Sequence, residues 1–182
     1  LDHFMQWGTP ADLEEYLYWS KSFRLISEKG KQVQPKHKGS LMLPMVGIGS
    51  RFISEGYESP KPLIKVSDKP MAVKALLDLP LTDQQHFILR SDMHGIDELT
   101  QALSNNSSNA KFCYLDYMTD GQATTCIEGA KELSIDQPIT IAACDNGMVY
   151  NSDSFNRLLE SNNVDVVVWA ARGYPGAIRN PE

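Results

Sequence analysis

Glycines and cations that suit phosphate binding stand close together in the first half of the chain. An apolar run from Leu41 to Val46, which predicts a buried strand, is followed at once by Gly47 and Gly49. Glycine accepts positive φ and lets a ligand approach the backbone, so a glycine turn after a strand can offer N–H groups to a phosphate. Arg51 and Lys61 add a planar guanidinium and a compact ammonium, two cations that suit phosphoryl oxygens. Together these residues predict a phosphate-transfer site.

Gly-x-Gly by itself is a weak motif, because it also occurs in ordinary turns. The segment lacks the Gly-x-x-x-x-Gly-Lys-Ser/Thr spacing of one common phosphate loop, and no third glycine completes Gly-x-Gly-x-x-Gly. The longer block around it is more specific than either glycine.

Residues 47–71 as a block resemble the signature of the sugar-phosphate nucleotidyltransferases, a family of NTP transferases that includes nucleotide-sugar pyrophosphorylases. The chain reads Gly47-Ile-Gly-Ser-Arg51, then Pro60-Lys-Pro62 and Lys69-Pro-Met71, where the family has Gly-x-Gly-Ser/Thr-Arg, Pro-Lys-Pro and Gly-Lys-Pro-Met. Met-Val replaces the family's Ala-Ala before the first glycine, which is a tolerable apolar change at the end of a strand. The resemblance implies an α/β fold, a Rossmann-like three-layer sandwich with a mostly parallel sheet of the nucleotide-diphospho-sugar transferase type.

A second candidate group follows the apolar run from Ile139 to Cys144, which predicts another strand and leads directly into Asp145. A carboxylate at a strand end is well placed to hold Mg²⁺, which proteins bind through one or two carboxylates together with substrate phosphates. The alternative is an aspartate that caps a turn. The resemblance favours the metal, because the family's Gly-Asp-Asn motif at this point carries a metal ligand. Cys144 stands where the family usually has Gly or Ser.

Asp120 and Gly121 open the helix that we predict over residues 123–133. A glycine here permits a base or ribose to lie against the backbone, and a helix N-terminus adds positive potential. The segment resembles the family's Asp-Gly-x-Ala, which frames the nucleobase. An ordinary helix start, explained by Asp120 alone, is the alternative.

The reaction that the resemblance implies joins a nucleoside triphosphate to a sugar 1-phosphate or a similar phosphomonoester and releases pyrophosphate. It also implies a role in nucleotide-sugar synthesis for surface polysaccharide. The implied catalytic residues are Arg51, on the β- and γ-phosphates, and Lys61, near the α-phosphate and the acceptor. Asp145 would bind Mg²⁺, and the implied nucleotide-binding residues are Gly47, Gly49, Ser50, Asp120 and Gly121.

Composition narrows the classes of function. The chain has 182 residues and a net charge of −6, which argues against a nucleic-acid-binding surface. No apolar run approaches 18 residues, so we expect no membrane span. The three cysteines, Cys113, Cys126 and Cys144, lie in apolar contexts without metal-binding spacing, and we expect them to be reduced and buried in a cytoplasmic protein.

From about residue 40 onward, predicted strands alternate with predicted helices, which is typical of a parallel sheet covered on both faces. Ligands bind such sheets beyond the carboxyl ends of the strands, where Gly47, Asp116, Asp145 and Ala171 should share one rim. The expected strands are 41–46, 86–90, 111–115, 139–144 and 164–170; the expected helices are 71–78, 96–103, 123–133 and 152–161.

Residues 1–39 do not follow this alternation. Thr9-Pro-Ala-Asp12 predicts a capped helix that runs to about residue 27, and residues 28–39 predict a basic, solvated linker. Residues 6–17 also resemble the tail of the same family, where Gly-Thr-Pro-Glu-Asp-Leu often opens a terminal helix. We therefore divide the chain into residues 1–39, as the tail of a preceding unit, and residues 40–182, as the nucleotide-binding part. A simple N-terminal capping helix on one domain is the alternative.

Members of the resembled family usually run well past the length of this domain, so we expect the acceptor half to be truncated. Without the strands of the acceptor half, one edge of the sheet would be exposed. An exposed edge can pair with another copy of the chain and so favours homo-oligomers. A non-catalytic nucleotide-binding or regulatory module with the same fold is therefore a second hypothesis. A glycosyltransferase ranks last, because Cys144-Asp-Asn146 replaces the Asp-x-Asp motif of that class.

Overall fold

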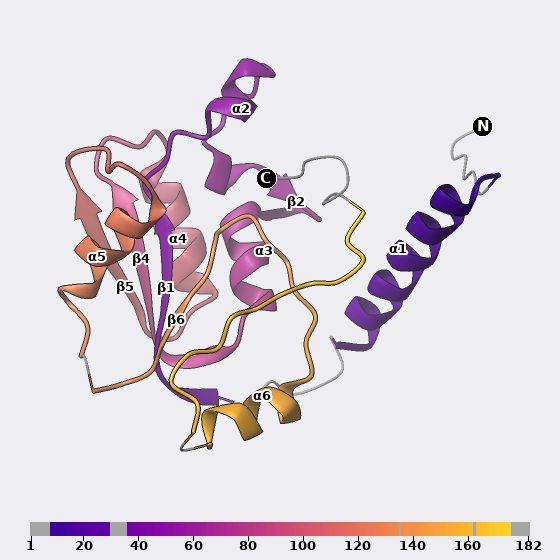
Figure 1. The fold of residues 1–182 in the computed structure, drawn as a ribbon. Coiled ribbons are helices and arrows are strands. Elements are labelled where there is room, and N and C mark those ends of the chain that lie inside the picture. Colours follow the sequence, from indigo (N-terminus) through magenta and orange to yellow (C-terminus); the bar gives the residue numbers. More distant parts are fainter. Residues whose placement is uncertain (1–7, 30–35, 135, 162, 176–182) are drawn as a thin grey trace. The chain divides into compact units, whose positions relative to one another are not determined.

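The computed structural model describes residues 8–29, 36–134, 136–161 and 163–175. The chain divides into two compact units, one of residues 34–148 and one formed by residues 1–33 together with 149–182. The candidate residues named above all lie in the unit of residues 34–148, except Ala171. Figure 1 labels helices and strands of both units. Each unit is described by itself.

A parallel sheet forms the centre of the unit of residues 34–148. Its strands are β1 (Lys36–Met45), β4 (Leu81–Arg90), β5 (Ala110–Leu115) and β6 (Ile139–Ile141), in the order β5-β4-β1-β6. Every neighbouring pair in this sheet is parallel, and the longest ladder, between β1 and β4, runs to Met45 opposite Leu89. The predicted α/β class with a parallel sheet is therefore confirmed.

Helices connect these strands and cover the sheet. The chain passes through α2 (Ser50–Ser54), the 3₁₀ turn η1 (Lys61–Leu63) and a small antiparallel pair, β2 (Lys65–Val66) with β3 (Lys69–Pro70). It continues through α3 (Met71–Asp78), α4 (Ile96–Asn105) and α5 (Gln122–Ala130). The expected helices at 71–78, 96–103 and 123–133 are all present, although α5 ends at Ala130.

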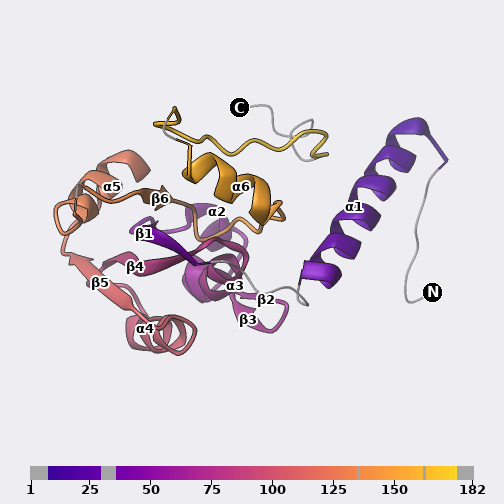
Figure 2. The same cartoon turned by 90° about the horizontal axis from the view of Figure 1, so that it is seen from below.

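Apolar side chains fill both faces of the sheet, as expected for parallel strands buried on two sides. Leu41, Leu43 and Phe87 belong to a core that includes side chains of α3 and α4. Met42 and Ile88 point to the other face and belong to a second core with side chains of α5. Figure 2 shows α4 and α5 on opposite sides of the sheet. The alternation of odd and even positions between the two cores is the period of two that a strand imposes. Three layers result: α3 and α4, the sheet, and α5.

Helix α5 approaches the sheet closely because residue 129 is glycine. A Cβ at Gly129 would lie 2.3 Å from Cδ1 of Ile88, so any side chain would push the helix away from β4. Close contact between α5 and β4 fixes the N-terminus of α5 near the carboxyl ends of the strands.

Strand β1 begins earlier than the sequence predicts. Residues 28–39 were expected to form a solvated linker, yet β1 starts at Lys36 and His37 is buried. Pairing with β4 explains the difference, because Lys36 lies opposite Leu81 and His37 opposite Thr82 before a bulge. Residues 30–35 of the expected linker lie outside the described residues.

Strand β6 is shorter and less buried than the sequence predicts. The expected strand 139–144 is reduced to three residues, and Ile139 and Ile141 are exposed rather than buried. Ala142 still donates its N–H to the carbonyl of Met42 at 3.1 Å. Among the described strands none pairs with its outer edge, so β6 is an edge strand of the sheet.

The strand expected at residues 164–170 is absent from the described part of the chain, so that prediction is wrong. Residues 164–170 adopt no strand, and the Val166 and Val168 side chains are 78% and 82% exposed. β-branched residues favour a strand only where a partner strand and a packed face support them. Ala171 consequently does not follow a strand end.

The other unit contains two helices with side-chain caps. Helix α1 (Pro10–Lys29) starts where Thr9 Oγ1 accepts the N–H of Asp12 at 3.2 Å, while Asp12 accepts the N–H of Thr9 at 3.2 Å. Helix α6 (Ser152–Leu159) starts at Asn151, whose side chain accepts the N–H of Ser154 at 2.8 Å. Both helices confirm predictions from the sequence.

Aromatic contacts hold the rest of this unit. The rings of Tyr150, Phe155 and Trp169 form a cluster, and Tyr174 packs against Tyr18 and Trp19 of α1. Among the helices that the structure describes, none is both long and apolar enough to cross a membrane.

Candidate functional site

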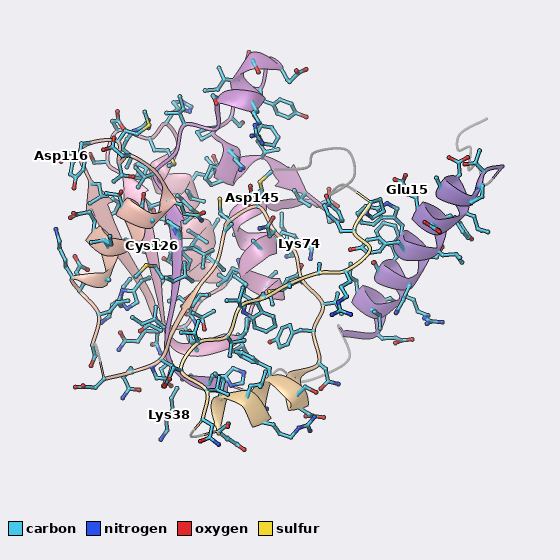
Figure 3. The ribbon with its side chains drawn as sticks, in the orientation of Figure 1. Glu15, Lys38, Lys74, Asp116, Cys126 and Asp145 are labelled. Carbon is cyan, nitrogen blue, oxygen red and sulfur yellow. The ribbon has the colours of Figure 1, made fainter. Side chains whose placement is uncertain are left out.

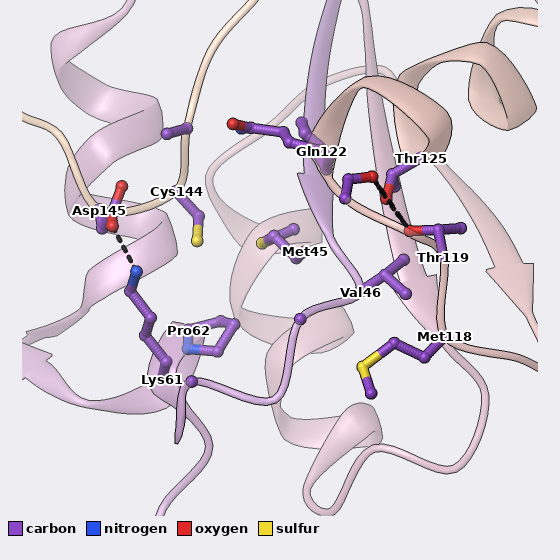
Figure 4. Close-up of a pocket in the computed structure, with 15 residues that line it drawn as sticks. Met45, Val46, Lys61, Pro62, Met118, Thr119, Gln122, Thr125, Cys144 and Asp145 are labelled. Atoms are coloured by element: carbon purple, nitrogen blue, oxygen red, sulfur yellow. Dashed lines mark hydrogen bonds and ion pairs between the residues drawn. The ribbon is translucent and has the colours of Figure 1, made fainter. Parts of the chain in front are cut away.

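A cavity of about 270 Å³ opens at the carboxyl ends of the parallel strands (Figure 4). Segments from four parts of the unit form its walls: the end of β1, the turn η1, the start of α5 and the residues after β6. Its lining residues are Pro44, Met45, Val46, Gly47, Gly49, Lys61, Pro62, Met118, Thr119, Gly121, Gln122, Thr125, Ala143, Cys144 and Asp145. The position agrees with the rule that open parallel sheets bind ligands beyond their carboxyl ends.

Residues 46–49, which we call the glycine loop, form one wall. A Cβ added at Gly47 would meet nothing within 4 Å, so the backbone of Gly47 is open to the cavity. Gly49 has φ of 69°, a left-handed conformation, and a Cβ there would lie 2.8 Å from Cβ of Lys61. Gly49 therefore has two reasons to be glycine: its backbone conformation and the Lys61 stem that packs on it.

Lys61 and Asp145 form an ion pair at the edge of the cavity (Figure 4). Their side chains are 27% and 32% exposed, so both charges reach solvent while their stems are partly covered. The Lys61 ammonium also lies 5.9 Å from the centre of the Phe52 ring. The structure thus brings together the residue predicted to bind phosphate and the residue predicted to bind Mg²⁺.

Cys144 lies in the wall beside this pair and is buried. Burial raises the pKa of the Cys144 thiol to about 11, and the negative charge of Asp145 adds to this increase. The positive charge of Lys61 lowers the pKa by a smaller amount. The thiol therefore keeps its proton at neutral pH and serves as a small apolar wall group rather than as a nucleophile.

The start of α5 forms the opposite wall. Thr125 is buried, and its hydroxyl lies 2.5 Å from that of Thr119 and donates to the carbonyl of Gly121 at 3.1 Å. Gly121, the N-cap residue of α5, has φ of 134°, and a Cβ there would meet nothing within 4 Å. Gln122 adds an amide and Met118 an apolar side chain.

Three predicted site residues lie outside the cavity walls. Of the described residues that line the cavity, none is Ser50, Arg51 or Asp120. Ser50 and Arg51 are exposed on the five-residue helix α2, directly after the glycine loop, and Asp120 is exposed beside Gly121. The structure brings together Gly47, Gly49, Lys61, Gly121 and Asp145, and places the other three next to them in sequence.

The predicted rim is present in part. Asp116 and Asp145 lie at the same end of the sheet, as Figure 3 shows, and Gly47 lines the cavity there. Sequence reasoning missed Met118, Thr119, Gln122 and Thr125. Their position after β5 gave the only signal, because residues that follow a parallel strand reach this rim.

The remaining cysteines are free, as expected, but only half-buried. Burial is the main cause that raises the pKa of both the Cys113 and the Cys126 thiol, and Glu132 adds to the effect at Cys113. Cys126 lies on α5, away from the cavity walls (Figure 3).

The cavity fits a cation that arrives with a phosphate better than a cation held by protein alone. Within residues 8–29, 36–134, 136–161 and 163–175, no group of three or more His, Cys, Asp or Glu side chains could hold a metal. Mg²⁺ usually keeps several waters and binds through one or two carboxylates plus substrate phosphates. Asp145 supplies one such carboxylate in the cavity wall, so the donor set suits Mg²⁺ on a nucleotide.

Comparison with known proteins finds similarity in structure. No protein-family model matches the chain, and no curated protein matches it. A nucleoside-diphosphate-sugar pyrophosphorylase from Vibrio cholerae RC9 is similar at 20% identity and a TM-score of 0.48, over 64% of this chain and 52% of that one. A nucleotidyl transferase from Methanothermobacter thermautotrophicus is similar at 22% identity and a TM-score of 0.48, over 66% and 56%.

A third similar structure is a UDP-glucose pyrophosphorylase complexed with UDP-glucose, at 13% identity and a TM-score of 0.49, over 68% of this chain and 54% of that one. The chain therefore spans about half the length of each of these solved structures.

Proposed function

We propose that the cavity binds a nucleoside triphosphate with Mg²⁺ and that the chain is the nucleotide half of a nucleotidyltransferase. The observation that carries the proposal is the convergence of the glycine loop, Lys61 and Asp145 on one cavity at the carboxyl ends of parallel strands. Backbone N–H groups, an ammonium and a carboxylate are the groups that a magnesium-bound triphosphate needs.

The proposed reaction asks little covalent chemistry of the protein. An oxygen of the acceptor phosphate forms a bond to the α-phosphorus, the bond from that phosphorus to the bridging oxygen breaks, and pyrophosphate leaves with the electron pair. Gly47 and Gly49 bind the phosphate chain with backbone N–H groups. Lys61 balances charge at the α-phosphate. Arg51, which lies on α2, binds the leaving pyrophosphate. Positioning and charge stabilisation carry the rate in such reactions.

Asp145 holds Mg²⁺ in this proposal, and the cation supplies positive charge that stabilises the phosphate oxygens. The start of α5 holds the nucleobase: Gly121 leaves room against the backbone, and Gln122 offers an amide. Ser50 and Asp120 flank these positions and keep the roles that the sequence predicts.

The acceptor that we propose is a sugar 1-phosphate or a similar phosphomonoester, used in nucleotide-sugar synthesis for surface polysaccharide in the cytoplasm. The motif of residues 47–71 supports this choice, since it is the part of the chain that resembles sugar-phosphate nucleotidyltransferases. A non-catalytic nucleotide-binding module is the alternative, and turnover distinguishes the two.

Two assays test the proposal. Binding of ATP, CTP, GTP, UTP and dTTP is measured with and without Mg²⁺, and pyrophosphate release is then followed with the bound nucleotide and a panel of sugar 1-phosphates. We expect Mg²⁺-dependent binding of one nucleotide and, with the right acceptor, pyrophosphate release. Binding without release by any acceptor favours the non-catalytic module. A folded chain that binds none of the five nucleotides contradicts the proposal.

A further inference from the structure

We propose that Arg90 is a positioning residue that sets the direction of the Gly47 N–H group. Its consequence for triphosphate binding rests on the function proposed above. Arg90 is the last residue of β4 and is absent from the described residues that line the cavity. It therefore acts on a ligand only through the glycine loop.

Arg90 supplies a hydrogen bond where the ladder between β1 and β4 ends. The last paired residues are Met45 and Leu89, and the chain then leaves the sheet as the glycine loop. Nη1 of Arg90 donates to the carbonyl of Val46 at 3.3 Å. The next N–H group, that of Ser91, bonds instead to the carbonyl of Leu115 at 2.8 Å. Beyond the last pair of this ladder, the Arg90 side chain therefore extends the contact between β4 and the segment that follows β1.

The Arg90 side chain is held in place for this contact. Its Nε forms an ion pair with Asp92, and only 19% of the Arg90 side chain is exposed. The backbone after β4 is also fixed, because Met93 is buried and donates its N–H to the carbonyl of Arg90 at 3.1 Å. A shielded, charged donor of this kind makes a stronger hydrogen bond than a neutral one.

The carbonyl of Val46 and the N–H of Gly47 belong to one peptide unit. A trans peptide is planar, so its carbonyl and N–H point in opposite directions and turn together. The buried Val46 side chain anchors one end of this unit, but Gly47 has no side chain and a Cβ there would touch nothing, so packing at Gly47 does not fix how the unit is turned. By holding the Val46 carbonyl, Arg90 fixes the direction in which the Gly47 N–H faces the cavity.

Order in the glycine loop tests this proposal without any ligand. The variants are Arg90→Met, Arg90→Lys and Asp92→Asn. Arg157→Met is the control, since Arg157 belongs to the other unit, where it donates to the hydroxyl of nearby Ser154. In Arg90→Met we expect the NMR order parameter of the Gly47 amide to fall from about 0.85 to below about 0.6, while the amides of Phe87 and Leu89 stay rigid. Arg90→Lys should keep part of the order that Arg90→Met loses, because lysine still offers a charged donor but lacks the planar guanidinium that bonds to two partners at once.

Binding gives the second readout. Arg90→Met should lower the affinity for the nucleoside triphosphate that the wild type binds by about tenfold, which is the effect of one charge-assisted hydrogen bond. The affinity for the matching nucleoside should not change. An unchanged Gly47 order parameter in Arg90→Met overturns the proposal, and so does equal weakening of triphosphate and nucleoside.

Two further outcomes are also decisive. If Arg90→Met does not fold, Asp92→Asn takes its place, and a Gly47 amide as rigid in that variant as in the wild type counts against the proposal. If the wild-type chain binds no nucleotide, the proposed function fails, while the order parameter still decides the role of Arg90.

Discussion

Lys61 and Asp145 stand 84 residues apart in the sequence and form an ion pair at the cavity edge. In the free chain each charge neutralises the other. A phosphate that binds Lys61 would release the carboxylate of Asp145 for a cation, and a cation on Asp145 would release Lys61 for a phosphate. Nucleotide and Mg²⁺ should therefore each raise the affinity of the chain for the other.

Asp145→Asn tests this coupling. The amide removes the charge that attracts a cation, so we expect nucleotide binding to lose most of its dependence on Mg²⁺. The free energy of unfolding should change by less than about 1 kcal/mol, because partly exposed ion pairs contribute little to stability. Calorimetric titration with and without Mg²⁺, together with thermal melting, measures both effects. Asp116→Asn, an exposed carboxylate at the same end of the sheet, is the control, and an equal loss there would count against the role of Asp145.

Gly49→Ala should destabilise the chain more than Gly56→Ala does. Both glycines have positive φ, 69° and 83°, so each alanine incurs a backbone cost of about 1 kcal/mol. Only at Gly49 does the new Cβ also collide with Lys61, since a Cβ at Gly56 meets nothing within 4 Å. Denaturant unfolding and nucleotide titration of both variants give the comparison. Equal loss of stability and of affinity in the two would contradict the packing of Lys61 on Gly49.

Thr125→Val should lower stability by about 1 kcal/mol, because it removes the bond between the Thr125 and Thr119 hydroxyls and the Thr125 bond to the Gly121 carbonyl, while Thr119 keeps its own bond to that carbonyl at 3.2 Å. Nucleotide affinity should fall as well, since these bonds order the start of α5. Thr124→Val makes the same substitution one position earlier, at a half-buried site, and should change little. Chemical denaturation followed by titration separates the two variants. A Thr125→Val chain as stable as Thr124→Val would rule out this role.

The raised pKa of Cys144 predicts a pH dependence. The folded chain holds the thiol proton more tightly than the unfolded chain, whose thiol pKa is near 9, so this contribution to stability is complete below pH 9. It should be lost as the pH rises from 9 to about 11. The free energy of unfolding of the wild type should therefore fall more steeply over this range than that of Cys144→Ala. Parallel curves for the two chains would contradict the burial of the thiol.

Much of the fold follows from local patterns. Strands β1, β4 and β5 and helices α3, α4 and α5 overlap the predicted apolar runs and periodic segments, because each buries its apolar face within one unit. Strands β1 and β4 each begin five residues before the predicted start, at Lys36 and Leu81. Residues 139–144 and 164–170 carry the same apolar, β-branched pattern but form a short exposed strand and no strand, respectively. Pairing between strands is a long-range property, so composition alone does not predict it.

The candidate site shows the same division. Gly47, Gly49, Lys61, Gly121 and Asp145 were found by motif and meet at one cavity. No motif identifies Thr119, Gln122 and Thr125, because their roles depend on how closely α5 packs on β4. Arg90 shows the same limit: its place at a strand end allows a role in the site, but the sequence favours a surface polar residue, and only the bond to the carbonyl of Val46 indicates otherwise.

Calorimetric titration of the wild type, Lys61→Met and Lys69→Met with magnesium-bound nucleoside triphosphate tests the central claim most directly. Lys69 is an exposed lysine of the same unit outside the cavity walls, so its variant matches the change in charge. We predict that the wild type and Lys69→Met bind one nucleotide alike and that Lys61→Met binds it at least about tenfold more weakly, as expected for a lost charge-assisted contact. Equal affinity in all three chains, or no binding by the folded wild type, would contradict a nucleotide site in this cavity.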